Sequence, residues 1–346
     1  MGYTTEQLVS IAGGFEAAIR SFSSDHADEI EGIAEGAGIQ KWCERANVPT
    51  PHIPPSANSA GSDAHACLQN REAYILNART EIMQAATMSR PAEGPTECTA
   101  LYSSSHAVLA QNWDWDHTAE SMTVFLRVER TDTGRTILQI CEPGILGKAG
   151  LNDVGVGVTL NILGRKDLHG DSTAGVPVHV LLRAVLEQDS VEQAIACVER
   201  APKHYGCQSC FIIGDDKGSY AILEINGEVV DVARQAEPPV HTNHYCGLGG
   251  VGVISNASQR NSTTARYDRA CALIEQVSDL DVDAVKGVLR DHAESDWPVN
   301  VPWAEDPRPG GMRVGTVTAV VMDMAERKMY ATPGSPRDYD FVELSL

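Results

Sequence analysis

The alternation of apolar and polar positions changes its period several times along the 346-residue chain. Apolar residues recur at helical spacing near the N-terminus, most clearly over residues 28–36, where a glycine ends the pattern. After Cys98 the chain changes to short β-rich runs separated by turn residues, which predicts an antiparallel meander. Helical spacing returns over residues 176–201, as two short helices joined near residues 188–190.

The second half of the chain repeats this change. Residues 209–233 predict strands, with a hairpin at Asn226-Gly227, the strongest short hairpin signal in the sequence. Residues 262–294 return to helical spacing, and residues 315–336 close with a strand pair. Strands and helices therefore alternate in blocks rather than one by one. This order favours an α+β fold, a pair of sheets with helices on the outer faces, over a βαβ repeat.

Composition excludes several classes of protein. The formal net charge is −20 and no run of Lys and Arg offsets it, so we expect no nucleic-acid partner. No apolar run approaches the length of a membrane span, so we expect no membrane partner either. Nine cysteines, an odd number at low density, together with an N-terminal segment that does not resemble an export signal, favour a reducing cytoplasmic location.

Cys98 is the candidate nucleophile, because it follows a Pro-containing loop and begins a predicted strand. A nucleophilic cysteine needs a nearby base, and no papain-like signature ties one of the eleven histidines to Cys98. A free α-amino group, with a reference pKa of about 7.7 to 8.0, is another suitable base. This second option requires Cys98 to become a chain terminus.

Six motifs give the chain a family resemblance. They are LNARTEIM, ECTALYSS, AQNWDWD, NDVGVGVTLNIL, HTNHYCGLG and TTARYDRA. In their order and approximate spacing, over about residues 70–345, the chain resembles the acyl-coenzyme A:6-aminopenicillanate acyltransferase family, which is itself similar to the choloylglycine hydrolases.

The resemblance implies an N-terminal nucleophile hydrolase, built as a four-layer αββα sandwich and made as a precursor that cuts itself. The cut would fall between Glu97 and Cys98. Residues 1–97 would form a helical propeptide or α chain with a Pro- and Ser-rich loop at 48–66, and residues 98–346 the β chain, together one domain. Relatives commonly have glycine where this chain has Glu97.

The resemblance also implies roles for an acid and an amide. Asp114 matches the carboxylate that holds the nucleophile and its amine, with Asp116 as the alternative. An exposed turn carboxylate is the non-functional interpretation of either acid. Asn243 matches the donor to the oxyanion, and a turn-forming asparagine is its non-functional interpretation.

Three further positions complete the expected frame. Arg266 matches the arginine that fixes the nucleophile, with Arg269 on the same predicted helix as the alternative. Asn161 lies in mid-strand, where asparagine is disfavoured, which predicts a second donor at the site or a buried asparagine that satisfies the strand. Gln111 stands where choloylglycine-type relatives have arginine, which argues against a bile-salt substrate.

Four neighbours of these motifs are expected to line the substrate site: Trp113, Trp115, His244 and Tyr245. Core packing explains the two tryptophans equally well. A Pro-rich loop with Trp297 and Trp303 is a further candidate for the pocket, or simply an exposed loop.

Two other patterns suggest cofactors but lack their structural context. The CQSC motif at 207–210, with later histidines and Cys246, suggests zinc, yet it leads into a strand and has no second cysteine pair. GLGGVG at 247–252 satisfies a dinucleotide fingerprint, yet no predicted helix follows it. We therefore expect no metal and no cofactor.

The sequence predicts a self-processing N-terminal cysteine amidohydrolase or acyltransferase acting on a small N-acyl compound through a Cys98 thioester. One alternative is an acyl-coenzyme A-dependent N-acyltransferase of secondary metabolism, although no cationic cluster offers itself to the phosphates. The other is an unprocessed, non-catalytic ligand-binding member of the fold. The expected partners are the small substrate, acyl-coenzyme A in the first alternative, and the two chains of one precursor, with a homo-oligomer left open.

Overall fold

The computed structural model describes residues 4–37, 71–88, 98–163, 175–201, 208–227, 229–247, 257–292, 297–305 and 313–346. The loop predicted at 48–66 and Glu97, on the expected cleavage bond, lie outside these ranges. The same holds for most of the GLGGVG motif and for Cys207 of CQSC.

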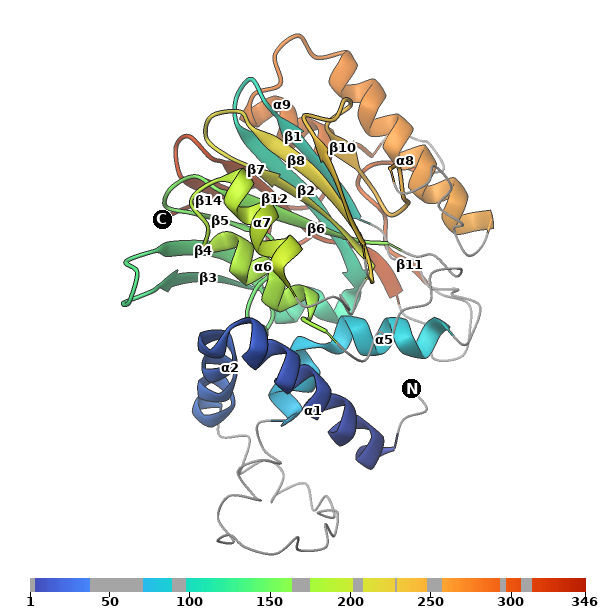
Figure 1. The fold of residues 1–346 in the computed structure, drawn as a ribbon. Helices are drawn as coiled ribbons and strands as arrows, with labels where there is room; N and C mark the ends of the chain where they lie inside the picture. Colours follow the sequence, from blue (N-terminus) through green and yellow to red (C-terminus); the bar gives the residue numbers. More distant parts are fainter. Residues whose placement is uncertain are drawn as a thin grey trace, which may run out of the picture.

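Two antiparallel sheets form the centre of the described structure (Figure 1). Sheet A has the order β10-β1-β2-β12-β13-β14, with β11 beside β12, and sheet B runs in sequence order from β3 to β9. The strands of sheet A are β1 (Cys98–Ser103), β2 (Val108–Asp116), β10 (Val240–His241), β11 (Ala304–Glu305), β12 (Arg313–Asp323), β13 (Lys328–Ala331) and β14 (Val342–Ser345). Those of sheet B are β3 (Val124–Glu129), β4 (Thr136–Cys141), β5 (Gly150–Asn152), β6 (Gly157–Ile162), β7 (Ser209–Gly214), β8 (Tyr220–Asn226) and β9 (Val229–Arg234).

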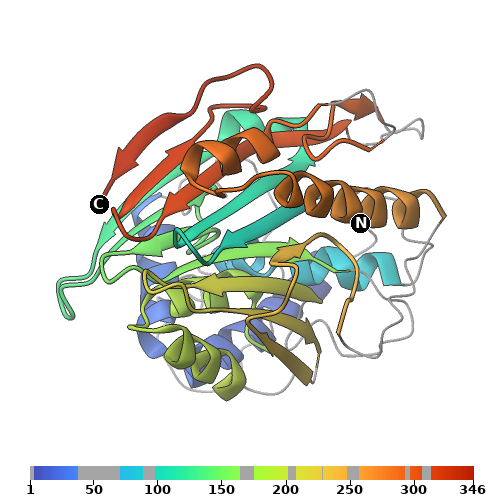
Figure 2. The ribbon, with the colours of Figure 1, turned by 90° about the horizontal axis from the view of Figure 1, so that it is seen from above.

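Helices cover the outer face of each sheet, as the view from above shows (Figure 2). On the side of sheet A lie α8 (Ala257–Glu275) and α9 (Val282–Leu289). On the side of sheet B lie α6 (Val178–Leu186) and α7 (Val191–Arg200), with α1 (Thr5–Phe22), α2 (Ser24–Gly36) and α5 (Arg79–Met88) beyond them (Figure 1). A 3₁₀ helix, η1 (His117–Met122), follows β2, and residues 71–77 are also helical.

Three groups of buried apolar side chains hold these layers together. One lies between the two sheets and contains Tyr102, Ile212 and Met322. A second joins sheet A to α8 and α9, and a third joins sheet B to α6, α7 and the N-terminal helices. Sheets buried on both faces by helices and by each other form the four-layer αββα sandwich that was predicted. The α+β prediction is therefore confirmed.

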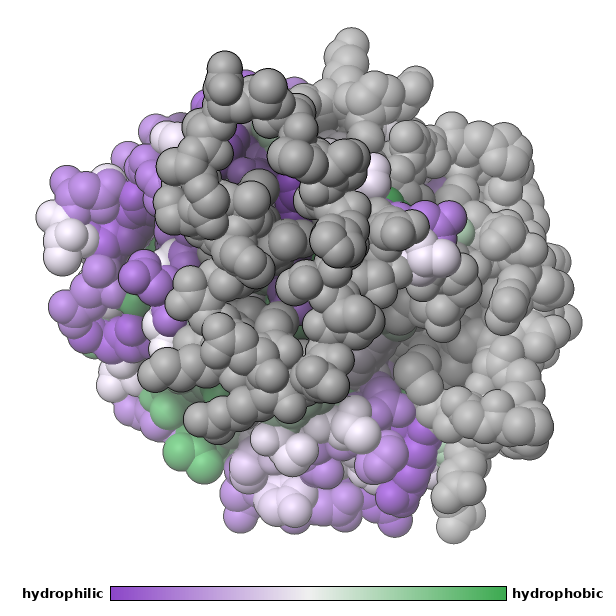
Figure 3. Space-filling model, turned by 90° about the horizontal axis from the view of Figure 1, so that it is seen from below, coloured by the Kyte–Doolittle hydropathy of each residue, from purple (hydrophilic) through white to green (hydrophobic). Residues whose placement is uncertain are grey.

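Local sequence signals explain where several elements begin. Thr4 and Gln7 form a capping box at the start of α1, and the side chain of Ser190 accepts the N–H of Gln193 at the start of α7. The predicted hairpin at residues 226–227 joins β8 to β9. The described part of the face seen from below is mainly hydrophilic, with a small hydrophobic area (Figure 3). None of the described helices is both long and apolar enough to cross a membrane.

Candidate active site

Cys98 is the first residue of β1 and pairs with Trp113 of β2. Its strand is buried over its whole length, because β1 lies between β2 and β10 in sheet A and packs against sheet B on one face. Only 5 % of the Cys98 surface is exposed. The fold therefore holds this residue rigidly on the strand that follows the predicted cleavage point.

The backbone of Cys98 is bound by side chains from three distant segments. Its N–H donates to Oδ1 of Asn243 at 2.8 Å. Its carbonyl oxygen accepts from Nη1 of Arg266 at 2.8 Å and from Nδ2 of Asn161 at 3.3 Å. Three of the predicted residues thus meet at the backbone of one residue, although the chain separates them widely.

Asn243 has a side-chain orientation that its partners determine. Oδ1 accepts from two groups that can only donate, the N–H of Cys98 and Nη2 of Arg266, the latter at 2.9 Å. Nδ2 donates to the carbonyl of Ile162 at 2.9 Å. An amide nitrogen carries two hydrogens, so this bond uses one and leaves the second for another acceptor. Asn243 can therefore hold the Cys98 nitrogen and act as a donor at the same time.

Arg266 rather than Arg269 reaches the nucleophile. Arg266 is fully buried, and its guanidinium also donates to Oγ1 of Thr99 at 3.0 Å. Arg269, one turn further along α8, forms an ion pair with Asp291 at 2.7 Å instead. The choice between the two arginines depended on which helix face meets sheet A.

Asn161 and Gln111 link the two sheets behind Cys98. Nδ2 of Asn161 also donates to the carbonyl oxygens of His241 and Thr242, at 3.0 and 2.9 Å. Gln111 of β2 donates to the carbonyl of Leu160 and accepts the N–H of that residue at 3.2 Å. Gln111 therefore fixes β6 beside β2, and Asn161 fixes the turn that carries Asn243.

Of the two candidate acids, Asp114 is the one beside the nucleophile. It is almost fully buried, and its Oδ1 accepts from Oγ1 of Thr316 at 2.6 Å. Asp116 instead caps η1 by accepting the N–H of Thr118 at 3.0 Å. The two acids share one face of the strand pattern, but only Asp114 lies inside the sandwich.

The thiol of Cys98 has a pKa raised to about 12 in this uncut chain. Burial is the main cause, and the Asp114 carboxylate adds to it. The backbone N–H of Asp114 and the charges of Arg266 and Lys148 act in the opposite direction. A base is therefore needed before this sulfur can act as a thiolate at neutral pH.

Lys148 was not predicted and lies in the same region. Its Nζ forms an ion pair with Glu142 at 2.6 Å and lies 3.4 Å from the centre of the Trp113 ring. Burial lowers the pKa of Lys148 to about 8, although Glu142 opposes this change. Arg79 of α5 also pairs with Glu142. The one available sequence signal was a lone lysine in the apolar run that leads into β5.

The residues predicted to line the substrate site separate into two groups. Trp113 lies beside Cys98 under Lys148, and Trp115 follows it two residues later, half-buried on β2. His244 is half-buried, with Nδ1 3.0 Å from Oγ1 of Thr263. Tyr245 is buried in the core between the sheets, and its hydroxyl donates to the carbonyl of Ile225 at 3.2 Å. The structure therefore does not bring Tyr245 together with the others.

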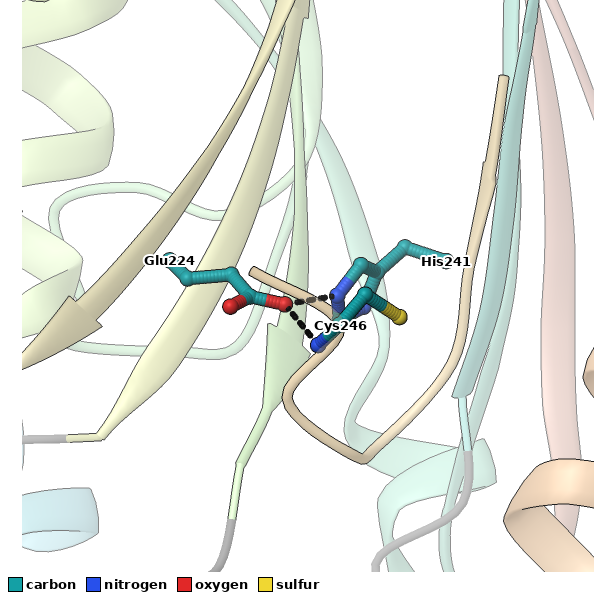
Figure 4. A group of neighbouring side chains, drawn as sticks. All are labelled: Glu224, His241 and Cys246. Atoms are coloured by element: carbon teal, nitrogen blue, oxygen red, sulfur yellow. Dashed lines mark hydrogen bonds and ion pairs between the residues drawn. The ribbon is translucent and has the colours of Figure 1, made fainter. Parts of the chain in front are cut away.

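A second cluster of reactive side chains lies beside Asn243, with His241 two residues before it and Cys246 three residues after it. Glu224, His241 and Cys246 face one another there (Figure 4). Burial alone would raise the pKa of Cys246, but hydrogen bonds with His241 and His244 lower it to about 7. Burial likewise opposes the charge on His241, yet its neighbours, Cys210 first, raise its pKa well above the usual value. Among the described residues, this is the group of His, Cys, Asp and Glu that could hold a metal ion.

Comparison with known proteins gives one family match. Residues 102–338 match the family model of the acyl-coenzyme A:6-aminopenicillanic acid acyl-transferases, which is more than half of the chain. A similar relative is the acyl-coenzyme A:6-aminopenicillanic-acid-acyltransferase 40 kDa form of Emericella nidulans. It is 28 % identical over 279 residues, which cover 78 % of this chain and 72 % of the relative.

Two solved structures are similar in fold. A mutant of conjugated bile acid hydrolase from Clostridium perfringens has a TM-score of 0.50 at 14 % identity, over 72 % of this chain and 92 % of that one. Penicillin V acylase from Agrobacterium tumefaciens has a TM-score of 0.48 at 15 % identity, over 72 % and 86 % of the two chains.

Proposed function

The chain belongs to the acyl-coenzyme A:6-aminopenicillanic acid acyl-transferase family, and from this we propose that it is a self-processing N-terminal cysteine amidohydrolase or acyltransferase. It has the sandwich fold of the N-terminal nucleophile hydrolases. The proposed substrate is a small N-acyl compound, whose acyl group passes through a thioester on Cys98. The location we propose remains cytoplasmic.

One observation carries this proposal, namely that the nitrogen of Cys98 is held as firmly as its carbonyl. An internal cysteine nucleophile needs only its sulfur positioned, whereas an N-terminal one uses its own amine as the base. The bond from the Cys98 nitrogen to Oδ1 of Asn243, at 2.8 Å, would keep that amine beside the sulfur after cleavage. A structural cysteine would not require a buried asparagine at its backbone N–H and a buried arginine at its carbonyl oxygen.

Self-processing would begin at the Glu97–Cys98 bond. Sγ of Cys98 attacks the carbonyl carbon of Glu97, and the C–N bond breaks as the C–S bond forms, with the thiol proton passing to the leaving nitrogen. Water then hydrolyses the thioester, which gives a carboxylate on Glu97 and frees both the thiol and the α-amino group of Cys98. Arg266 and Asn161, bound to the Cys98 carbonyl, would hold this residue still during the exchange.

Substrate turnover would then repeat the same two steps on the amide bond of the substrate, with the free α-amino group of Cys98 as the base. The neutral amine accepts the thiol proton, and the thiolate attacks the amide carbonyl of the substrate. The second N–H on Nδ2 of Asn243 would stabilise the oxyanion, a contribution typically worth about 10²- to 10³-fold in rate. The amine product leaves with a proton, and water releases the acid from the thioester.

The charged groups around Cys98 would orient the amine and stabilise the thiolate. Asp114, buried and bound to Thr316, would orient the amine, since a nearby negative charge raises the pKa of an amine rather than lowering it. Arg266 and Lys148 would stabilise the thiolate, because both lower the pKa of the Cys98 thiol. Nζ of Lys148 lies 3.4 Å from the centre of the Trp113 ring, which supports the proposal that Trp113 lines the substrate site.

Acyl transfer from a coenzyme A thioester is the second candidate, favoured by the similarity to the Emericella nidulans acyltransferase. Both reactions pass through the Cys98 thioester. They differ in the bond that is broken to acylate Cys98, an amide or a coenzyme A thioester, and in the nucleophile that takes the acyl group, water or an amine. The −20 net charge without a basic run gives coenzyme A phosphates little to bind, so hydrolysis of an amide is the function we prefer.

Intact mass spectrometry of the purified chain tests the proposal. Wild type should give two polypeptides, 1–97 and 98–346, and Cys98→Ala should remain one. Cys271→Ala, which removes a half-buried thiol of α8, is the matched control and should still be cut. A folded wild-type chain that stays uncut and fails to acylate would contradict the enzyme assignment and favour a ligand-binding protein.

Trapping the acyl-enzyme would then separate the two reactions. Wild type is loaded either with an N-acyl 4-nitroanilide or with an acyl-coenzyme A thioester, and the thioester is offered water with or without 6-aminopenicillanic acid. Release of 4-nitroaniline with free acid as the product supports the hydrolase. Loading only by coenzyme A, with an amide product, supports the transferase.

A further inference from the structure

The cluster of Glu224, His241 and Cys246 joins the two sheets. Glu224 comes from β8 of sheet B, His241 from β10 of sheet A, and Cys246 from the turn that follows β10. One carboxylate oxygen, one imidazole nitrogen and the sulfur all lie within 4.8 Å of one another (Figure 4). Glu224 and His241 are buried, whereas Cys246 is exposed, so the cluster opens to solvent at the sulfur.

The hydrogen bonds of His241 determine which of its nitrogens faces the cluster. Nδ1 lies 2.9 Å from the carbonyl oxygen of Thr242, which can only accept, so Nδ1 carries a hydrogen. Nε2 lies 2.8 Å from Oε1 of Glu224. In a neutral imidazole this would set a lone pair against a carboxylate, so a proton or a metal cation must lie between them. A histidine whose Nδ1 donates to a backbone carbonyl is the arrangement usual for metal ligands.

Glu224 is oriented in the same way. Its Oε1 accepts the N–H of Cys246 at 2.5 Å, and its Oε2 accepts the N–H of Gly247 at 2.9 Å. The backbone N–H groups of residues 246 and 247 therefore face the carboxylate, and the sulfur of Cys246 lies on the other side of its backbone nitrogen, still within 4.8 Å of the ligand oxygen (Figure 4). A ligating carboxylate is commonly held by such outer hydrogen bonds.

His244 supplies a fourth candidate ligand. Its Nε2 lies 3.6 Å from Sγ of Cys246, and its Nδ1 lies 3.1 Å from Oγ1 of Thr242. Zinc bond lengths of about 2.3 Å to sulfur and about 2.0 Å to nitrogen place two tetrahedral ligands about 3.6 Å apart. The sulfur of Cys246 and Nε2 of His244 already have this spacing, while Nε2 of His241 and Oε1 of Glu224 would have to separate by about half an ångström. The ring of His244 would also have to move toward His241, because the two ring centres are 6.2 Å apart and His244 lies outside the group that is within 4.8 Å.

We propose that Glu224, His241, Cys246 and His244 form a zinc site that connects sheet B to the turn carrying Asn243. The set of one thiolate, two imidazoles and one carboxylate suits zinc among the biological cations. The sequence predicted no metal, because the CQSC pattern at 207–210 leads into a strand and lacks a second cysteine pair. In the fold, Glu224 of β8 lies beside His241 and Cys246 and supplies an acidic ligand in place of such a pair.

The proposed zinc site lies next to Asn161, Asn243 and Arg266, the residues that bind the backbone of Cys98, but does not include them. Asn161 binds the carbonyls of His241 and Thr242, and Asn243 lies between two of the proposed ligands. Zinc would therefore hold the turn in the position from which Asn243 reaches the Cys98 nitrogen. Bound metal would stabilise the folded state, since the ligands are assembled only by the fold.

Metal binding by the purified full chain tests the proposal. Wild type, reduced and stripped with a chelator, should bind one zinc ion in competition with a chromogenic chelator, and zinc should raise the melting temperature. Cobalt in place of zinc should give a thiolate-to-cobalt absorption band and the intense visible bands of a tetrahedral site. Cys246→Ser should lose the charge-transfer band and weaken zinc binding by at least about a hundredfold, because even outer-sphere partners cost about 10- to 100-fold.

Three further variants make the result specific. Cys271→Ser, which changes another thiol that is not fully buried, should bind zinc like wild type. His244→Gln should weaken binding by about tenfold or more, and an unchanged affinity would remove His244 from the site. Zinc binding that is lost in Cys98→Ala but kept in Cys246→Ser would place the metal at the nucleophile and overturn the proposal. A folded, reduced wild type that binds no zinc would overturn it as well.

Discussion

Cys98 and Cys246 lie on either side of Asn243 in opposite surroundings. Cys98 is buried at the start of β1, beside a carboxylate, with its thiol pKa raised to about 12. Cys246 is exposed on a turn, beside two histidines, with its thiol pKa lowered to about 7. Judged by acidity alone, Cys246 is the more reactive thiol. The backbone N–H and carbonyl of Cys98, however, are the groups bound by Asn243, Arg266 and Asn161.

The contrast shows that a lowered thiol pKa is a poor guide to the nucleophile in this fold. An N-terminal nucleophile obtains its base from its own amine, so the Cys98 thiol of the proposed mature enzyme would not need a lowered pKa of its own. Cys246 has histidine partners but lacks a comparable frame of donors around its own backbone among the described residues, and its neighbours suit a metal ion better.

The largest expected difference is in alkylation. At pH 7, half of Cys246 is thiolate, against a fraction of about 10⁻⁵ for Cys98 in the uncut chain, because their pKa values are about 7 and about 12. Greater intrinsic nucleophilicity of the more basic thiolate recovers about 10²-fold, which leaves a ratio of roughly a few hundredfold. Iodoacetamide labelling of chelator-treated precursor, followed by peptide mass spectrometry, should show this ratio. Equal rates at the two thiols would contradict the pKa contrast.

The second prediction concerns the two arginines of α8. Arg266→Met should slow processing and, in the chain that is processed, lower the acylation rate by about 10²- to 10³-fold, because the Cys98 carbonyl and Oδ1 of Asn243 lose a buried donor. Arg269→Met removes an ion pair with Asp291 at the surface of the same helix and should change the rate by less than about threefold. Acyl-enzyme formation by stopped flow measures both.

A change in folding must be separated from this effect. Arg266→Met also leaves buried acceptors unsatisfied, so a loss of stability of about 1 to 3 kcal/mol is expected alongside the loss of rate. Arg266→Lys keeps the charge and should recover part of the rate. Equal losses in the Arg266 and Arg269 variants, with both folded, would argue against a specific role of Arg266.

The smallest expected effect is that of Lys148. Lys148→Met should raise the pKa of the Cys98 thiol and slow acylation by about tenfold below pH 8, since one pKa unit corresponds to tenfold in thiolate fraction. The pKa of Lys148 is about 8, so its charge is lost as the pH rises through that value. The difference between wild type and variant should therefore shrink above pH 8. A pH profile of the acylation rate measures this effect.

Lys286 provides the matched control for Lys148. It also lies over an aromatic ring, with Nζ 3.8 Å from the centre of Tyr330, but it belongs to α9, away from Cys98. Lys286→Met should leave the pH profile of acylation unchanged. A constant offset between wild type and Lys148→Met at every pH would instead indicate a purely structural role for Lys148.

The sequence predicted the elements better than it predicted the contacts. The hairpin at residues 226–227, the paired helices α6 and α7 and the αββα layering follow from periodicity and turn chemistry, which are local. The choice of Arg266 over Arg269 needed the packing of α8, and the choice of Asp114 over Asp116 needed the burial of β2. No sequence motif marks Lys148. Its partners Glu142 and Trp113 lie 6 and 35 residues before it in the chain, and the fold brings them together.

By itself the sequence determined the family, the order of strands and helices and the choice of Cys98 as the candidate nucleophile, since motif order and alternating hydrophobicity are properties of the chain. Only the tertiary structure decided which side chains bind the backbone of Cys98. It also decided that Glu224 lies beside His241 and Cys246. The reason is physical. Hydrogen bonds and ion pairs act over a few ångströms, and their partners here are brought together by strand pairing and sheet packing across more than a hundred residues.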